Sequence, residues 1–522
     1  MLQLDMSSLH QFKQLCRQLK SCVMPPSDKE KTRLVLKRIK NLKKAILEGC
    51  FLRRHASGSF HCQAKGSLCY TAITGDFFTN GRGASRYQAR IGCLMEMAER
   101  YSAFKHLIDP SKIIISSSGR FKNNPFSIES LMANSPDDPS FNLVSHKEFS
   151  GLRLGWHKCF DLDGLTAYLP LRMIADFLEG SNGMAAGFSL KEAILKGLLE
   201  SIERDRAVRI RSGGLDTPLI EGKSIKDSRA KKLIRGFNLL GHHVFIRDFS
   251  LKLPIPVIGV ARRVNCKDFL LTVSTGLTAD EALIRALSEN SQIEPGRFNF
   301  LKVRENPQYF RATPKINMRD IPDMNGGSVS RSLDILKDII NKSGMVAFFC
   351  DATDKELRMP VAITYIAAAK VNSQKEEGKD FLFGLIAELF RAGEDKAAGL
   401  FLKRAKQKDK ERYLFYMGNK FIAEGRQIQA LGYFRRLLKK SSIDRFKEVS
   451  LYWLGLDALS RKDNRKALNY FSALVKQRPG SFYPAFLTSA CRHKAFANAQ
   501  QLYLKLWLAD NSSYLKKENL AI

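Results

Sequence analysis

The sequence predicts an α+β protein in which a domain built around capped helices is followed by an all-α domain of helical repeats. Three observations lead to this prediction. The chain has 522 residues, and because a typical domain holds roughly 100–200 residues, two or three domains are expected. One helical pattern occurs three times before residue 300, and a different helical pattern recurs in the last quarter of the chain.

Composition excludes several protein classes. A hydrophobic content of 44% with 10% aromatic residues fits a globular protein and excludes global disorder. The first ten residues lack the basic lead and apolar core of a signal peptide, and the longest apolar stretches are about half or less of the roughly 20 residues that cross a bilayer. We therefore expect a cytoplasmic protein that does not contact a membrane.

Ten cysteines are scattered along the chain, and no Cys-x-x-Cys pair suggests a zinc or redox site. We interpret them as reduced thiols of the core. Cys62 and Cys69, with His61 beside them, come nearest to a metal cluster, and we interpret both as buried strand thiols.

The formal net charge of +33 is concentrated at the two ends of the chain. Residues 1–60 hold 13 basic and 4 acidic residues (+9), residues 401–522 hold 25 and 9 (+16), and the middle carries the remaining +8. This distribution is compatible with a catalytic middle whose basic ends meet acidic or RNA-rich partners. The alternative is that the Lys and Arg residues occupy solvated helix faces.

The pattern that occurs three times is a capped helix, with offsets of 104 and 89 residues between copies. Each copy opens with Gly, has Ser or Thr two positions later, and Gln or Glu three positions after that. A hydroxyl and a Gln or Glu at this spacing form a capping box, which fixes where a helix begins. The predicted helices begin after Ser85, Ser189 and Thr278, and Gln88, Glu192 and Glu281 are interpreted as reciprocal caps, with a nucleotide or metal contact as the alternative for Glu192.

Three turns after its cap, each helix carries two polar residues at i, i+3 spacing, which places both side chains on one face. These pairs are Glu96 with Glu99, Glu200 with Glu203, and Glu289 with Gln292. Apolar neighbours put the acids beside the buried stripe of each helix. Because unpaired buried carboxylates are costly, such clusters are normally neutralised by cations or by bound metal.

Mg²⁺ suits these acids, since it takes oxygen ligands and is usually held by a few carboxylates together with substrate phosphates. Each copy also supplies an arginine that could neutralise phosphate: Arg100, Arg204 and Arg285. One isolated copy would be interpreted as a solvated surface with local ion pairs. Three matching copies instead predict a magnesium–nucleotide site, although Arg204 could alternatively be a structural partner of Asp205 or a neighbouring glutamate. Common phosphate-loop and protein-kinase motifs are absent from the sequence.

These motifs resemble those of the YcaO family, ATP-dependent enzymes that activate peptide backbone amides. The first resemblance joins Phe78-Thr-Asn-Gly-Arg-Gly-Ala-Ser85 to Glu96-x-x-Glu-Arg100, and the second joins Ser181-Asn-Gly-Met-Ala-Ala-Gly187 to Glu200-x-x-Glu-Arg-Asp205. The third spans Ala282 to Gln292, and Asp351-Ala-Thr353 with Met359-Pro-Val361 is similar to a weaker family element. The resemblance covers residues 25–370.

The resemblance implies a mixed α/β fold with a sheet-supported nucleotide site and ATP and Mg²⁺ as cofactors. In the implied reaction a nucleophile adds to an amide carbonyl, and ATP phosphorylates the resulting oxygen so that it can leave. The nucleophile is a Cys, Ser or Thr side chain in cyclodehydration, sulfide in thioamidation, or an amine in amidine formation. Carried over by position, the metal ligands are Glu96, Glu99, Glu200, Glu203 and Glu289, and the nucleotide site adds Thr32, Arg100, Glu192, Arg204, Arg285 and Gln292. No catalytic residue is assigned.

Three features depart from the family pattern. Phe188 stands where many members have Asn, and Thr32 is the match to an amino-terminal nucleotide-binding Ser or Thr but lacks a well-placed preceding Lys. The chain ends Asn519-Leu-Ala-Ile522, without the proline-rich terminus of the azoline-forming branch. The Phe78-Thr-Asn-Gly stretch is closer to the enterobacterial-type branch, which has been linked to ribosomal-protein methylthiolation.

The last quarter of the chain carries a tetratricopeptide-like pattern. Trp453-Leu-Gly-Leu-Asp-Ala458, Ala467, Tyr470-Phe471 and Pro479 form one copy, and Gly418, Ala430 and Tyr433-Phe434 form another 37 residues upstream. Stacked repeats of this kind commonly bind a peptide or protein, here an acidic one. A dimerisation surface or a structural cap is the alternative.

These inferences divide the chain into a basic segment (1–24), a YcaO-like ATP-binding domain (25–370), a polar linker (371–380) and tetratricopeptide-like helical repeats (381–522). The expected partners are a peptide or protein substrate and a companion or ribosomal protein bound by the basic repeats, and the chain is expected to form a homodimer. The competing function is that of a non-catalytic ATP-binding or scaffold protein acting through its repeats.

Overall fold

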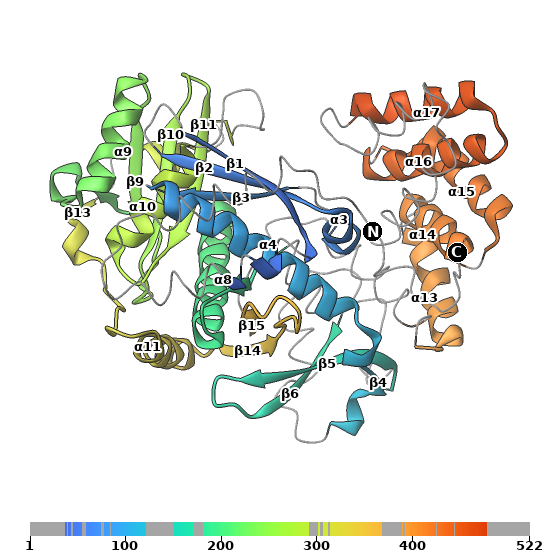
Figure 1. The fold of residues 1–522 in the computed structure, drawn as a ribbon, viewed down its shortest axis with the longest axis horizontal. Coiled ribbons are helices and arrows are strands. Elements are labelled where there is room, and N and C mark those ends of the chain that lie inside the picture. The colour runs from blue at the N-terminus through green and yellow to red at the C-terminus, as the bar shows by residue number, and fades with distance from the viewer. Residues whose placement is uncertain are drawn as a thin grey trace. The chain divides into compact units, whose positions relative to one another are not determined.

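A computed structural model describes residues 37–38, 40–42, 45–54, 59–74, 78–83, 85–121, 151–171, 181–213, 215–291, 301–302, 306–311, 314–367, 389, 392–408, 410–423, 425–442 and 444–477. The predicted basic segment 1–24 and linker 371–380 lie outside these residues. Two compact units make up the chain. The first unit contains the strands described below, apart from most of β4 and the start of β5. The second unit contains helices α13–α17 (Figure 1).

In the first unit, a three-stranded antiparallel sheet has the order β1–β2–β3, formed by β1 (Leu47–Arg54), β2 (Phe60–Gly66) and β3 (Phe78–Gly83). Helix α3 (Leu68–Thr74) connects β2 to β3, and the long helix α4 (Arg86–Ile108) packs against β2 and β3. The contact is close because β3 is rich in glycine. A Cβ atom on Gly81 would lie 2.0 Å from the carbonyl oxygen of Ala89 on α4.

A second sheet has the order β12–β11–β10–β9–β8–β13. Its strands are β8 (Leu219–Ile220), β9 (Val244–Asp248), β10 (Val257–Arg263), β11 (Asp268–Thr275), β12 (Leu301–Lys302) and β13 (Lys315–Ile316). Helices α9 (Ser228–Leu239) and α10 (Ala279–Asn290) bury one face each in the same hydrophobic cluster as residues of β8, β9 and β10.

The third sheet of the first unit runs β5–β14–β15–β7, with β6 paired to β5. Its members are β5 (Arg153–Asp161), β6 (Thr166–Pro170), β7 (Met184–Ala186), β14 (Val346–Asp351) and β15 (Val361–Ala367). Helix α8 (Leu190–Gly213) packs on β7 and β15 and also reaches β11, and α11 (Val329–Lys342) packs on α8. The helix α8 therefore joins this sheet to the second sheet.

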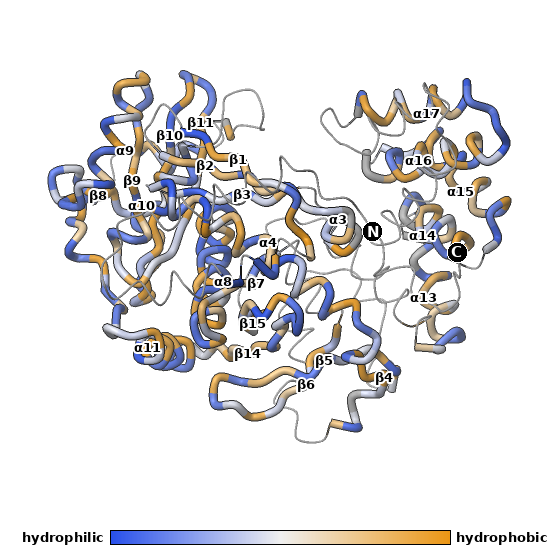
Figure 2. The backbone as a smooth tube through the Cα atoms, in the orientation of Figure 1, coloured by the Kyte–Doolittle hydropathy of each residue, from blue (hydrophilic) through white to orange (hydrophobic). Residues whose placement is uncertain are grey.

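Amphipathic sequences explain why the outer helices bury one side. In α9 the buried residues are Ala230, Leu233 and Phe237, and in α11 they are Ser332, Leu336 and Ile340. Both sets follow the 3.6-residue helical period. In Figure 2 the backbone of both helices alternates between hydrophobic and hydrophilic colours accordingly.

The cysteines follow the sequence interpretation only in part. Cys62 is buried in β2 as expected, whereas Cys69 is exposed on helix α3, so its interpretation as a buried strand thiol is wrong. Cys159 of β5 and Cys350 of β14 are joined as a disulfide. The expectation of reduced thiols is therefore also wrong for this pair, because adjacent antiparallel strands bring the two residues together.

The second unit contains β4 (Ile113–Ser117) and a succession of packed helices: α13 (Asp395–Lys408), α14 (Lys410–Ala423), α15 (Gln427–Lys440), α16 (Asp444–Ser460) and α17 (Asn464–Gln477). Each helix from α14 onward packs on the next. Gly418 of α14 approaches the Phe434 ring of α15, and Gly455 of α16 approaches Phe471 of α17. The all-helical carboxyl-terminal region and the sheet-containing amino-terminal part confirm the predicted α+β fold class.

Short 3-10 turns complete the described backbone: η2 (Pro110–Lys112), η3 (Ser118–Arg120), η5 (Gly222–Ser224), η7 (Pro307–Phe310) and η8 (Met318–Asp320). Within the part of the chain that the structure describes, no helix has both the length and the apolar character that a membrane span requires.

Candidate functional site

The three predicted capped helices are α4, α8 and α10, and each directly follows a strand, β3, β7 and β11 respectively. The side-chain oxygens of the caps accept hydrogen bonds from the backbone three residues later. Ser85 accepts from the N–H of Gln88 (3.2 Å), Ser189 from Glu192 (3.2 Å), and Thr278 from Glu281 (3.1 Å). All three predicted helix starts are therefore confirmed.

The glycine two residues before each cap lies against the first turn of its helix. A Cβ atom would lie 2.4 Å from the Gln88 Cβ if placed on Gly83, and 2.6 Å from a backbone nitrogen of the helix if placed on Gly187 or Gly276. A side chain at these positions would therefore push the helix away from its strand. The repeated Gly is thus required by the sharp turn from strand to helix.

In the second and third copies, the glutamate of the capping box completes the box from the other side. Glu192 accepts from the backbone N–H of Phe188 (2.9 Å), and Glu281 accepts from that of Leu277 (3.0 Å). Glu192 also forms an ion pair with Lys196 (2.7 Å). In this arrangement Glu192 acts as a cap, and its alternative role at a nucleotide or metal stays a prediction.

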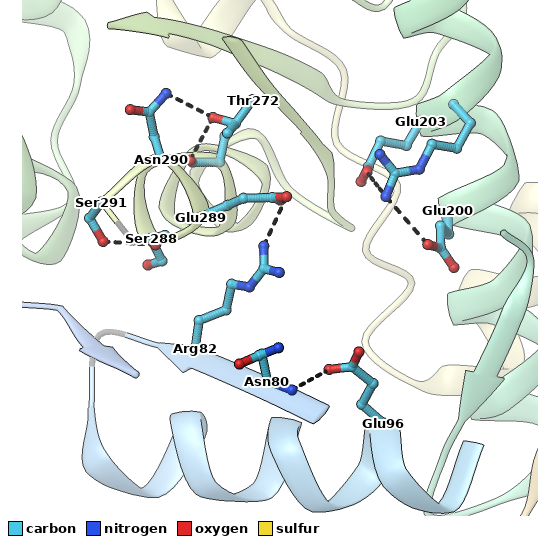
Figure 3. Close-up of polar contacts among 12 residues, drawn as sticks. Asn80, Arg82, Glu96, Glu200, Glu203, Thr272, Ser288, Glu289, Asn290 and Ser291 are labelled. Atoms are coloured by element: carbon cyan, nitrogen blue, oxygen red, sulfur yellow. Dashed lines mark hydrogen bonds and ion pairs between the residues drawn. The ribbon is translucent and has the colours of Figure 1, made fainter. Parts of the chain in front are cut away.

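The first acid of each pair forms an ion pair with a guanidinium. Figure 3 shows Glu96, Glu200 and Glu289 around one space between their helices. Glu96 of α4 pairs with Arg100 (2.8 Å) and accepts from the backbone N–H of Asn80 (3.1 Å). Glu200 of α8 pairs with Arg204 (3.5 Å).

In the third copy the charge of the glutamate is neutralised by an arginine from a different element. Glu289 of α10 pairs with Arg82 of strand β3 at 2.8 Å, and Figure 3 shows Arg82 extending from β3 toward α10. Sequence reasoning missed Arg82, although it lies in the quoted Phe78–Ser85 stretch. The predicted arginine, Arg285, is exposed, and its charge acts on Glu200, Glu203 and Glu289.

The second acid of the first two pairs is held by the strand of the next copy. Glu99 of α4 has a backbone hydrogen bond from Ala186 at the end of β7, and Glu203 of α8 accepts from the N–H of Thr275 at the end of β11 (3.0 Å). Ala186 and Thr275 are equivalent, since each precedes the glycine of its copy. The second glutamate of the first copy therefore binds the strand of the second copy, and that of the second copy binds the strand of the third.

Burial makes the ionised form of three acids unfavourable. It raises the pKa of Glu200 to about 7 and the pKa of Glu203 above its usual value, and the guanidinium of Arg204 opposes both shifts. The pKa of Glu99 lies well above its usual value because of burial and the nearby Glu200 and Glu96. The opposite holds for Glu289, where the charges of Arg82 and Arg204 outweigh burial and lower the pKa.

The end of α10 is fixed by a buried polar network. The side-chain amide of Asn290 donates to the carbonyl oxygens of Val260 (3.1 Å) and Leu270 (3.4 Å) and to the hydroxyl of Thr272 (3.2 Å). These bonds attach α10 to β10 and β11 one residue after Glu289. The network thereby sets the position from which Glu289 enters the site.

Arg38 contacts the turn before α8. Its guanidinium donates to the carbonyl oxygens of Phe188 (3.3 Å) and Gly187 (3.5 Å). This basic residue lies in the amino-terminal part where sequence reasoning found only Thr32. Its signal was weak, because a Lys- and Arg-rich segment offers many equivalent candidates.

Most of the predicted site residues come together. The set that shares one electrostatic cluster is Glu96, Glu99, Arg100, Glu200, Glu203, Arg204, Arg285 and Glu289. Arg204 pairs with the neighbouring Glu200 and Glu203 (3.5 and 3.6 Å). Asp205, the other partner considered for Arg204 from the sequence, pairs with Arg209 instead (2.8 Å). Thr32 and Gln292 lie outside the described residues.

The donor chemistry of the cluster fits Mg²⁺, because its acids offer carboxylate oxygens, the ligands that this ion takes. Burial disfavours the negative charge on three of these acids, and a bound cation would offset that cost. Among the described residues, no three His, Cys, Asp or Glu side chains are arranged to hold a metal directly. Guanidinium groups lie between the acids instead. Binding of Mg²⁺ at these carboxylates would require the arginines to move aside.

Comparisons with known proteins agree with this chemistry. Residues 80–368 match the family model described as "YcaO cyclodehydratase, ATP- and Mg²⁺-binding". An uncharacterised protein of Methanothermobacter thermautotrophicus is 24% identical over 342 residues, which cover 57% of this chain and 82% of that protein.

Two solved structures are similar to this chain, and the first shows the same fold. A heterocyclase in complex with substrate and cofactor has a TM-score of 0.52 at 16% identity, covering 64% of this chain and 52% of its own, so that this chain spans about half of that protein. The structure of YcaO from Methanopyrus kandleri bound with AMPPCP and Mg²⁺ has a TM-score of 0.49 at 18% identity, covering 66% of this chain and 91% of its own.

The family model covers more than half of the chain and includes the three capped helices of the site. It also confirms the predicted cofactors, ATP and Mg²⁺, and makes the chain an ATP-dependent enzyme by family. The chain belongs to the YcaO family.

Proposed function

We propose that this protein uses ATP and Mg²⁺ to activate a backbone amide of a peptide or protein by O-phosphorylation. The observation that carries the proposal is the convergence of five carboxylates and four guanidinium groups from three equivalent strand–helix units. Alternating charges of this kind suit a metal-bound polyphosphate, since phosphoryl transfer depends mainly on positioning and charge neutralisation.

In the proposed reaction a nucleophile adds to the amide carbonyl carbon and its π electrons move to oxygen. That oxygen attacks the γ-phosphorus of ATP and releases ADP. The phosphorylated oxygen then leaves as inorganic phosphate, so that the amide oxygen ends in the phosphate. Thioamidation and cyclodehydration share these steps and differ in the nucleophile. An accessory role in ribosomal-protein methylthiolation is a separate alternative that these steps do not describe.

The proposed roles of the side chains follow their placement. Glu96, Glu200 and Glu289 would hold Mg²⁺ through carboxylate oxygens, with Glu99 and Glu203 beside them, and the bound ion would neutralise phosphate charge. Arg100, Arg204, Arg285 and Arg82 would then be released toward the phosphates. Gln292 and Thr32 stay proposed contacts of the nucleotide.

The helical region is proposed to contact the substrate or a companion protein. The glycine–phenylalanine packing of Gly418 with Phe434 and of Gly455 with Phe471 supports tetratricopeptide-like repeats. An acidic peptide or a ribosomal protein suits the basic composition of this region. The domain boundaries, the homodimer and the cytoplasmic location likewise stay predictions.

The proposal is tested by calorimetric titration of the full chain with AMPPCP in the presence and absence of Mg²⁺, together with ADP release from ATP. We expect Mg²⁺-dependent binding that Glu200→Ala removes, because this variant lacks a central carboxylate. A matched control is Glu48→Ala, whose ion pair with Lys65 is exposed at the surface of the first sheet. The control should bind like the native protein.

Absence of Mg²⁺-dependent nucleotide binding at millimolar AMPPCP would contradict the proposal. Binding without ADP release in the presence of peptide substrates would instead favour the competing function, a non-catalytic ATP-binding scaffold. Phe188 is the residue that bears on this choice, because it replaces the Asn of many family members and its carbonyl oxygen is held by Arg38.

A further inference from the structure

A groove lies between helix α9 and the strands β8 and β9, separate from the charged cluster. Its volume is about 440 Å³, which is within the range of about 300–1,000 Å³ found for ligand pockets. The floor is aliphatic and consists of Ile220, Ile225, Ile234, Val244 and Ile246. A ligand for this groove therefore needs an apolar part.

The charges that line the groove are of one sign. Lys231 and Arg235 lie one helical turn apart on α9, and both are exposed. Neither forms an ion pair with any residue that the structure describes. Two nearby acids pair with other residues, Glu221 with Lys223 (3.2 Å) and Asp227 with Arg229 (2.8 Å). The groove therefore combines an apolar floor with a positive rim that attracts carboxylates.

The apolar surface continues along the same face of α9. Leu239 follows Arg235 by four residues, so both lie on one side of the helix, and Leu239 is 90% exposed. Leu240 is exposed as well. A segment that alternates acidic and aliphatic side chains would match this stripe of two cations followed by leucine.

The groove and the nucleotide site share a hydrophobic core. Ile225 and Ile246 of the floor belong to one buried cluster with Leu283 and Leu287 of α10. Glu289 lies at the end of the same helix. An occupant of the groove would therefore pack on the same hydrophobic core that supports α10, the helix that carries Glu289.

We infer that this groove binds an acidic, aliphatic segment of the peptide or protein substrate, away from the amide that is activated. The inference rests on the proposed function for the identity of the occupant. Charge complementarity selects the acidic character, and the aliphatic floor selects leucine- or isoleucine-like side chains. Docking at such a distance would let one enzyme recognise a substrate without contacting the reacting residue.

The test is fluorescence anisotropy with a short fluorescein-labelled peptide in which Leu and Glu alternate, added to the full chain. Two further probes replace Glu by Lys, or Leu by Ser. The Leu–Glu peptide should bind the native protein, and the other two should bind at least about tenfold more weakly. Equal binding of the Ser–Glu peptide would overturn the inference, because it would show attraction by net charge alone.

Three variants locate the site. The double variant Lys231→Glu, Arg235→Glu should weaken the Leu–Glu peptide by about tenfold or more and strengthen the Leu–Lys peptide. Gly222→Trp should fill the groove while both cations remain, since a Cβ on Gly222 meets no atom within 4 Å. Lys232→Glu is the control, because this exposed residue of α9 reverses one positive charge on the same helix, half the charge change of the double variant, without lining the groove.

Two further results would overturn the inference: a loss of binding in Lys232→Glu equal to that of the double variant, or unchanged binding in Gly222→Trp. Circular dichroism of each variant distinguishes lost binding from lost folding. If Gly222→Trp does not fold, Gly222→Leu takes its place in the experiment. Titration of the same samples with AMPPCP and Mg²⁺ distinguishes the two proposals. Peptide binding without nucleotide binding would contradict the proposed function and leave the groove as a peptide site.

Discussion

Arg82 and Glu289 balance charge at the centre of the site across two separate elements. In α4 and α8 the inward glutamate has an arginine one turn later on the same helix, but α10 has no such residue. Arg82 of β3 fills that place at 2.8 Å. The pair therefore ties the first strand–helix unit to the third and makes their spacing sensitive to what occupies the site.

This arrangement predicts that the Arg82–Glu289 interaction is lost when Mg²⁺ and nucleotide bind. A double-mutant cycle with Arg82→Ala and Glu289→Ala, measured by urea unfolding, should give a coupling of about 0.5–1 kcal/mol without ligand, since the pair is partly exposed. Saturating AMPPCP and Mg²⁺ should reduce it.

The control is the same cycle on Lys105 and Asp354, which pair at 2.8 Å and belong to no part of the proposed site. Their coupling should not change with ligand. A ligand-independent coupling for Arg82 and Glu289 would mean that the pair is purely structural.

Glu200 predicts a particular pH dependence of stability. Burial raises the pKa of Glu200 to about 7 in the folded state, so between about pH 4.5 and 7 the folded state binds more protons than the unfolded state. Its contribution to stability is therefore complete below this window and is lost as the pH rises through it, by at most about 1.4 kcal/mol per pH unit.

Urea unfolding of the native protein and of Glu200→Gln across this range checks the sign. The stability of the native protein relative to the variant should fall as the pH rises. A difference that grows with pH would contradict a raised pKa. Mg²⁺ should also bind more tightly at higher pH, because binding requires the ionised carboxylate.

At the level of elements, helix starts were predictable from sequence because a capping box is a local structure. The hydroxyl of Ser189 and the carboxylate of Glu192 lie within one turn and contact backbone of the same turn. Arg82 was not predictable in the same way, since its partner lies on a helix far away in the sequence. Neither was the disulfide of Cys159 and Cys350, which depends on the pairing of β5 with β14.

The turn from strand to helix gives a test at this level. Gly276→Ala should lower the free energy of unfolding by about 1–3 kcal/mol, because the new Cβ would lie 2.6 Å from the backbone nitrogen of Ala282. The displaced α10 should also weaken Mg²⁺-dependent AMPPCP binding.

Gly222→Ala provides the comparison, since a Cβ there meets no atom within 4 Å. Its stability should stay within about 0.5 kcal/mol of the native value. Equal destabilisation by both substitutions would show that the turn before α10 has no special steric requirement.

For the whole molecule, the order of a sheet-containing part followed by helices was predictable from the two repeated patterns. How three helices from distant stretches bring their acids together was not, because that depends on β7 pairing with β15 and on α8 spanning two sheets. The three matching copies predicted one magnesium–nucleotide site, and the family resemblance added the amide-activating reaction that this site is expected to perform.

Two compact units predict two thermal transitions in scanning calorimetry. AMPPCP with Mg²⁺ should raise one transition only, because the charged cluster belongs to the first unit. Gly455→Val should lower the other by disturbing α16 and α17, since its Cβ would lie 2.4 Å from the Phe471 ring. A single transition that responds to both changes would mean that the units unfold as one.

The hydrogen bonds from Ala186 to Glu99 and from Thr275 to Glu203 turn two backbone amides into reporters of the site. Each amide proton is protected from solvent exchange as long as its carboxylate keeps its orientation. A ligand that draws Glu99 or Glu203 toward a metal would alter the exchange rate at a strand end in the neighbouring unit. Occupancy of the centre would thus be recorded as a change in hydrogen-exchange protection at Ala186 and Thr275, positions that no ligand needs to touch.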